Sequence, residues 1–213
     1  MHKRKRLLFI AIFVITLFCN SVVFGEEVEI KLNQEEWKEL NEFFSNFSEV
    51  FLKPFKKGQV SNTELVRFGI LHNLWNNYQL FQPYNSSYLK LDKKFVETTV
   101  EKYFGIKSIT HESVGDKIYK DGYYIIPVSS GEAYLFSQVT KFIDMGNGYY
   151  VAFLNLYIAS SGFGGDPHGN LKTWNKERDG DIPKLSSKMV ATVKKVTSNG
   201  SSRYILIEYL RDK

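Results

Sequence analysis

The periodicity of apolar residues changes once along this chain, at Gly105. Between residue 33 and that glycine, apolar side chains recur every three or four positions, which is typical of amphipathic helices. Beyond it they follow short segments with the character of strands. Short turn sequences separate these later segments, and short turns join strands that pair antiparallel. This order predicts an α+β fold in which three N-terminal helices pack on a curved antiparallel sheet of about four to six strands.

Three segments carry the signals that begin helices. Asn33 with Glu36, and Ser61 with Glu64, have the spacing of capping boxes, and Asp92 is a third N-cap residue. The apolar residues of the second segment cover more than one face, so we expect that helix to be central and mostly buried. The expected helices cover residues 34–53, 62–78 and 93–104, with Gly105 just past the end of the third.

Beyond Gly105, several segments have the pattern of strands. The connection 160–187 is longer than is usual inside a compact domain, and such loops often carry function. The stretch 79–91 contains Pro83 and several turn-forming residues, and we expect it to be irregular. The expected strands lie within 117–128 (two strands around Asp121-Gly122), 132–143, 149–159, 188–196 and 203–210.

The amino terminus has the three parts of a secretory signal peptide. Basic residues from Lys3 to Arg6 precede an apolar run, and Val23-Phe24-Gly25 forms a permissive cleavage site. We therefore predict a signal peptide over residues 1–25 and a single α+β domain over 26–213. Two alternatives stay open. The segment remains uncleaved as a membrane anchor, or Cys19 is lipidated, although the preceding phenylalanine is not the small residue that a bacterial lipobox requires.

The net charge and the cysteine content exclude one class of function and one kind of stabilising bond. The chain has 28 basic and 23 acidic residues, and its first 25 residues hold four of the basic ones and none of the acidic ones, so the remainder has a formal charge of +1. A nearly neutral exported domain is not a candidate for binding nucleic acid. Cys19 is the only cysteine, so the domain is held by its core without disulfides. We expect a secreted or cell-envelope location, with membrane contact only through an uncleaved N-terminal segment.

Two resemblances add to these expectations. The order of helices followed by an antiparallel meander resembles the cystatin-like and NTF2-like cone, in which a bent sheet wraps a helix and leaves a cavity. The segment Ala159-Ser-Ser-Gly-Phe-Gly-Gly-Asp-Pro-His-Gly169 is similar to a segment of uncharacterised exported proteins from low-GC Gram-positive bacteria. The first resemblance implies a cavity beside the sheet, and the second implies export without implying an activity.

The glycine-rich loop 161–169 is the first candidate site. Glycines permit close approach of the backbone, and Asp166-Pro167 favours a rigid turn. In one interpretation, Asp166 and His168 face a cavity as an acid–base pair or as two metal ligands, with Phe163 and Trp174 as neighbouring binding residues. In the other, the loop is an elaborate turn in which Asp166 accepts backbone hydrogen bonds and His168 is solvated or stacked on Trp174.

His72 and Trp75, in the second predicted helix, are candidate cavity-lining residues. His72 shares a face with apolar neighbours, and the alternative is a core histidine whose nitrogens are satisfied. A zinc site takes three or four ligands, whereas the predicted domain has only His72, His111 and His168, without the spacing of a metal motif. We therefore predict no metal site and no cofactor.

Three classes of function remain. The first is a non-enzymatic exported domain that binds a small molecule, a peptide or a cell-envelope component. The 13 tyrosines and 3 tryptophans suit an aromatic-lined cavity, although they also suit an aromatic-rich core. The second is a hydrolase that uses Asp166 and His168. The third is a structural or interaction protein of the cell surface with an exposed apolar patch.

Overall fold

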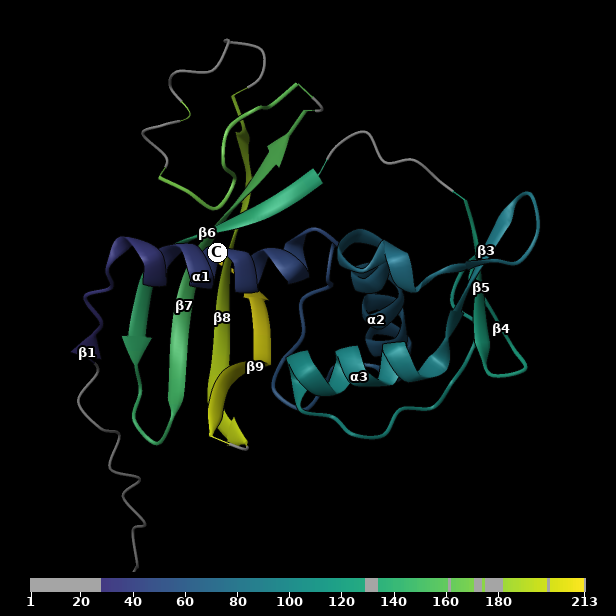
Figure 1. The fold of residues 1–213 in the computed structure, drawn as a ribbon. Helices are drawn as coiled ribbons and strands as arrows, with labels where there is room; N and C mark the ends of the chain where they lie inside the picture. Colours follow the sequence, from purple (N-terminus) through teal and green to yellow (C-terminus); the bar gives the residue numbers. More distant parts are fainter. Residues whose placement is uncertain are drawn as a thin grey trace, which may run out of the picture.

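The computed structural model describes residues 28–128, 134–160, 162–170, 174, 182–198 and 200–212. These residues form three α-helices and two antiparallel sheets (Figure 1), which confirms the predicted α+β class. The predicted signal peptide, residues 1–25, lies outside the described residues. Within the described ranges, none of the helices has both the length and the apolar character needed to cross a membrane.

The larger sheet has five strands in the order β1-β6-β7-β8-β9, all antiparallel to their neighbours. Register shifts interrupt the pairing of β6 with β7, of β7 with β8 and of β8 with β9. Such bulges bend the strands that carry them. Its strands are β1 (Val28–Glu29), β6 (Tyr134–Asp144), β7 (Tyr149–Ala159), β8 (Lys184–Ser198) and β9 (Ser201–Arg211).

Helix α1 (Gln34–Ser48) lies across one face of this sheet (Figure 1). Asn33 and Glu36 form the predicted capping box at its start. Small side chains allow the helix to approach β6 closely. Ser45 Oγ accepts a hydrogen bond from the backbone N–H of Ser137 at 2.9 Å, and the Ser137 hydroxyl donates to that of Ser48 at 3.0 Å. All three serines are buried, so these bonds fix α1 on the strand.

Helices α2 (Asn62–Asn76) and α3 (Lys93–Phe104) pack against each other between the two sheets (Figure 1). Leu65 and Phe68 of α2 join the core beneath the larger sheet, whereas Val66 and Ile70 join the core of the smaller one. Because α2 serves two cores, it is apolar on more than one face, as predicted. The expectation that all three helices cover one sheet is not met, since among the helices only α1 lies across the larger sheet.

The smaller sheet has four strands in the order β2-β3-β5-β4. The predicted hairpin around Asp121-Gly122 is present as β4 and β5, and both turn residues have positive φ. The prediction that 79–91 is irregular is wrong, because this stretch forms a short 3₁₀ helix (Tyr78–Leu80) and two strands. The partner of β3 is β5, more than 30 residues later, and periodicity within a short window does not reveal such a partner. The strands are β2 (Gln82–Pro83), β3 (Tyr88–Asp92), β4 (Ile118–Lys120) and β5 (Tyr123–Pro127).

The contact between α2 and α3 depends on Gly69. A Cβ at this position would lie 2.7 Å from Val96 Cγ1 and 3.1 Å from the Val96 carbonyl oxygen. Alanine in place of glycine normally stabilises a helix by about 1 kcal/mol. We expect Gly69→Ala instead to lower the free energy of unfolding by about 1–3 kcal/mol, because it overpacks the interface. Urea denaturation measures the change.

The sign of this effect tests the helix–helix contact. In a Val96→Ala background the nearest clashing atom is gone, so the additional cost of Gly69→Ala should be smaller than in the unmodified protein. If Gly69→Ala stabilised the protein by the amount expected from helix propensity alone, α2 and α3 would not approach each other as described.

Candidate functional site

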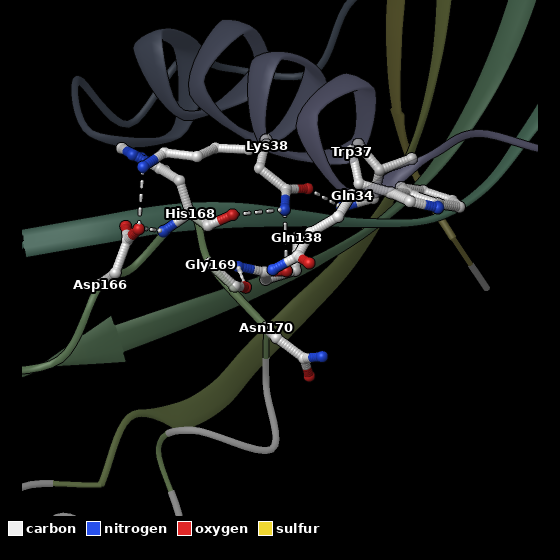
Figure 2. A pocket seen from close by; sticks show the side chains of 10 residues that line it. Gln34, Trp37, Lys38, Gln138, Asp166, His168, Gly169 and Asn170 are labelled. Atoms are coloured by element: carbon white, nitrogen blue, oxygen red, sulfur yellow. Dashed lines mark hydrogen bonds and ion pairs between the residues drawn. The ribbon is translucent and has the colours of Figure 1, made fainter.

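A cleft of about 470 Å³ lies between α1 and the loop that follows β7 (Figure 2). Helix α1 forms one wall, the loop forms the other, and β6 lies between them. Lys38 reaches from the helix to Asp166 at one end, and Trp37 lies at the other end. The lining residues are Gln34, Trp37, Lys38, Asn41, Gln138, Val139, Asp166, His168, Gly169 and Asn170.

Two buried amides hold the loop against the rest of the domain. Asn41 Nδ2 donates to Gln138 Oε1 and to the His168 carbonyl oxygen, both at 3.0 Å, and Asn41 Oδ1 accepts the N–H of Val139 at 2.7 Å. Gln138 Nε2 donates to the carbonyl oxygens of Pro167 and Gly169. Because these bonds join three elements far apart in sequence, the loop wall has a defined position before any ligand arrives.

Asp166 organises the turn of the loop. Its Oδ1 accepts the backbone N–H of His168, and its Oδ2 accepts Lys38 Nζ, both at 3.0 Å. Burial raises the pKa of the Asp166 carboxyl, but the bonds from Lys38 and the His168 amide outweigh burial and hold that pKa below its ordinary value. The pKa of Lys38 is correspondingly raised, first by its hydrogen bond to Asp166. The carboxylate is therefore ionised and engaged, as the turn interpretation expects.

His168 is half-buried at the edge of the cleft. Burial lowers the pKa of its imidazole, and the charges of Glu42, Asp166 and Glu49 only partly oppose this effect. The ring is therefore neutral near pH 7. Among the described residues, none forms a hydrogen bond with either ring nitrogen, so the geometry contains no Asp166–His168 side-chain pair.

Phe163 and Trp174 lie behind the loop wall, and neither lines the cleft. Phe163 stacks on Phe136 with ring centroids 6.1 Å apart, and Trp174 meets Phe136 edge-on at 5.3 Å. Trp174 Nε1 donates to the Asp166 carbonyl oxygen at 2.9 Å. These two aromatic residues anchor the loop on the sheet, so their place in the structure is that of supports for the residues that face the cleft.

His72 and Trp75 do not join the loop residues. His72 is buried beside Phe68, with ring centroids 5.6 Å apart, and its Nδ1 lies 3.7 Å from Glu49 Oε1 and 3.3 Å from Asn76 Nδ2. That is the arrangement of a satisfied core histidine. The Trp75 side chain is 47% exposed and is not among the residues that line the cleft.

Sequence reasoning missed four of the residues that shape the cleft. These are Trp37, Lys38, Asn41 and Gln138, none of which is among the candidate residues of the sequence analysis. A signal was present for two of them. Asn41 shares a face of the helix with Trp37 and Phe44, and Gln138 follows Phe136 in the alternation of β6. A polar residue inside an apolar pattern indicates a buried hydrogen-bonding role.

The cleft offers binding groups more readily than catalytic ones. An acid catalyst needs a carboxyl that is protonated near neutral pH, whereas Asp166 is held ionised by Lys38. A catalytic imidazole needs a partner that orients it, and no side chain of the described residues does so for His168. Within the described ranges there is also no group of three or more His, Cys, Asp or Glu residues arranged to hold a metal ion.

The buried amide of Asn41 gives a direct test of how the loop is held. We expect Asn41→Asp to lower the free energy of unfolding at pH 7 by about 2–4 kcal/mol, because an oxygen would replace the nitrogen that donates to two carbonyl acceptors. This loss should shrink as the pH falls, since a protonated carboxyl can again donate one hydrogen bond. Chemical denaturation across a pH series measures both effects.

Gln34→Glu is the matched control, because it makes the same chemical change at an exposed position of the same helix. A carboxylate in the first turn of a helix is favourable, so this variant should be as stable as the unmodified protein or slightly more stable. Equal behaviour of the two variants would show that the Asn41 amide does not hold the loop.

Comparison with known proteins gives no match for this chain. No protein-family model fits it, and no curated protein and no solved structure is significantly similar to it. The function therefore has to be argued from the cleft and its chemistry.

Proposed function

We propose that this protein is an exported, non-enzymatic binding domain, and that a small molecule, a peptide or a fragment of the cell envelope binds in the cleft between α1 and the loop after β7. The proposal of export rests on the pattern of residues 1–25. The proposal of binding rests on the cleft, whose volume of about 470 Å³ lies in the range of roughly 300–1,000 Å³ that small-molecule sites occupy.

One observation carries the proposal: the cleft is held open by side chains that are themselves fully engaged. Asn41 and Gln138 use their amides on the backbone of the loop, so they fix its position. Two further lining side chains have unused polar groups. The indole N–H of Trp37 and the side-chain amide of Gln34 have no hydrogen-bond partner among the described residues. A preformed wall with free donors and acceptors is what a binding site requires.

The free groups favour a ligand that is rich in hydroxyl or amide groups. Trp37 offers a flat apolar surface with one donor, Gln34 offers both a donor and an acceptor, and the neutral ring of His168 can donate at one nitrogen and accept at the other. Lys38 is already paired with Asp166. A saccharide of the cell envelope has this combination of apolar faces and hydroxyl groups, and we propose it as the ligand class.

The resemblance to a cystatin-like or NTF2-like cone is part of this proposal. Its support is the order of elements: β1 and α1 come first, and the meander from β6 to β9 then forms one sheet with β1. The segment 52–128, with α2, α3 and the smaller sheet, would then be an insertion between α1 and the meander. In such a cone the ligand lies between the helix and the bent sheet, which is the place of the cleft.

Trp37→Ala tests the proposed function. The probe is the tetrasaccharide of β-linked N-acetylglucosamine, titrated into the purified protein by isothermal titration calorimetry. We expect binding by the unmodified protein and a loss of about tenfold or more in affinity for Trp37→Ala. A nucleobase stacked on an aromatic ring contributes about 1–3 kcal/mol, and we expect the apolar face of a sugar ring on the indole to contribute an amount of the same order. His168→Ala should weaken binding similarly while leaving the melting temperature nearly unchanged.

Trp75→Ala is the matched control, because Trp75 is an exposed tryptophan outside the cleft and its removal should leave the affinity unchanged. Chemical shifts in a nuclear magnetic resonance titration should change at Val139 and Gly169. Equal losses for Trp37→Ala and Trp75→Ala, or an absence of saccharide binding, would count against this ligand class. A large loss of stability in His168→Ala would favour the turn interpretation of the loop.

A further inference from the structure

A second cavity, of about 240 Å³, lies at the C-terminal end of α1. The chain leaving α1, residues 48–54, forms one side, and the ends of β6, β7, β8 and β9 form the other. It shares no lining residue with the first cleft. The lining residues are Ser48, Phe51, Leu52, Lys53, Pro54, Leu135, Leu156, Ser186, Ser187, Met189, Tyr209 and Arg211.

Phe51, on the rim of this cavity, has an unfavourable backbone conformation. The N–H of Leu52 donates to the Phe47 carbonyl and that of Phe51 to the Ser48 carbonyl, which is the Schellman motif that ends many helices. The motif places Phe51 in the left-handed region at φ 52°, where glycine is the preferred residue and a bulky side chain is an outlier. The Phe51 side chain is also 59% exposed, so burial in the core does not explain why a phenylalanine is present.

The surrounding structure holds this strained corner in place. Arg67 donates to the carbonyl oxygens of Val50 and Phe51 at 2.8 and 2.9 Å, and it also bonds Glu64, whose carboxylate accepts the backbone N–H of Lys53 at 2.9 Å. Strained conformations persist where neighbouring contacts enforce them, and they concentrate at functional sites. The corner is therefore rigid and presents Phe51 at the cavity mouth.

The floor of the cavity is apolar. Leu135, Leu156 and Met189 are buried lining residues from three neighbouring strands. Tyr209 completes the floor, and a backbone bridge between Tyr209 and Phe55 ties the outgoing chain to β9. The Tyr209 hydroxyl is buried and has no hydrogen-bond partner among the described residues. An unsatisfied buried hydroxyl is costly, and the apolar floor offers it no partner.

Two cations complete the lining. Lys53 and Arg211 are exposed side chains on opposite sides of the cavity, one from the corner after α1 and one from the end of β9. Neither forms an ion pair with a described residue. By contrast, Arg67 is paired with Glu64, and Lys38 of the first cleft is paired with Asp166. No carboxylate is among the lining residues, so the charge of this cavity is positive.

From this combination we infer that the second cavity binds a small aliphatic carboxylic acid. The alkyl chain lies between Phe51 and the floor of Leu135, Leu156 and Met189, and the carboxylate is held by Arg211 and Lys53. The volume of about 240 Å³ is below the roughly 300–1,000 Å³ of drug-sized sites, which suits a short acyl chain and not a whole lipid. This inference does not rest on the function proposed for the first cleft.

Octanoate is the probe for this site, titrated into the purified protein by isothermal titration calorimetry, with octanol and acetate as comparison ligands. We expect octanoate to bind at least tenfold more tightly than either, because octanol lacks the charge and acetate lacks the chain. Arg211→Met should weaken octanoate binding about tenfold, which equals about 1.4 kcal/mol, and should leave octanol binding nearly unchanged.

Phe51→Gly separates function from stability. Glycine relieves the left-handed strain, so the melting temperature should rise, while the affinity for octanoate should fall about tenfold. Asn147→Gly is the matched control, since Asn147 is another non-glycine residue with positive φ that lies outside the cavity. It should leave octanoate binding unchanged.

Three results would overturn the inference: equal affinities for octanoate and octanol, unchanged octanoate affinity in Phe51→Gly, or no octanoate binding at millimolar concentration. Nuclear magnetic resonance locates the ligand. Methyl signals of Leu135, Leu156 and Met189 should shift on binding, and shifts at Val139 in the first cleft in their place would also contradict the assignment.

Discussion

The close contact between α1 and β6 determines where both cavities lie. Ser45 and Ser48 of the helix meet Ser137 of the strand through buried hydrogen bonds, and small side chains at these positions bring the two backbones together. Buried hydrogen bonds of this kind are directional and costly to break, so they fix the position of the helix along the strand. That position sets Asn41 opposite Gln138, which in turn fixes the loop.

The sequence predicted where the helices begin because the signals for helix starts lie close to the residues they describe, whereas α1 ends at Ser48, five residues before the expected end. Asn33 begins α1 and Asp92 begins α3, both as N-caps, and Gly105 ends α3 in the left-handed conformation expected of it. What could not be predicted is which elements share a core. Strand β3 finds its partner β5 across α3, and α2 divides its apolar residues between two cores. Such pairings are settled by packing over long distances, which local periodicity does not encode.

The candidate site was also predicted only in part: its loop residues were identified, and the residues that hold the loop were not. Loop chemistry alone led to Asp166 and His168, and both line the cleft. The residues that hold the loop could not be identified in this way, because Asn41 and Gln138 are 97 positions apart and meet only in the folded chain. Trp174 donates a hydrogen bond to the Asp166 carbonyl oxygen from the side of the loop that faces away from the cleft. An aromatic residue close to a polar loop in the sequence can therefore support the loop without lining the cleft.

The two cavities differ in chemistry for a structural reason. The first lies where α1 and β6 contribute the side-chain amides of Asn41 and Gln138. These amides donate to the backbone carbonyl oxygens of the loop that forms the other wall. The second lies where α1 has ended, so the floor is the bare apolar face of the sheet and the wall is the strained corner at Phe51. The bonds from Ser45 and Ser48 to Ser137 lie between the two cavities, and we expect a helix held by such bonds not to slide when one cavity is occupied. Coupling between two sites requires an element with two arrangements. In the structure α1 is bonded to β6 at one place along the strand, so we expect occupation of one cavity to leave the affinity of the other unchanged.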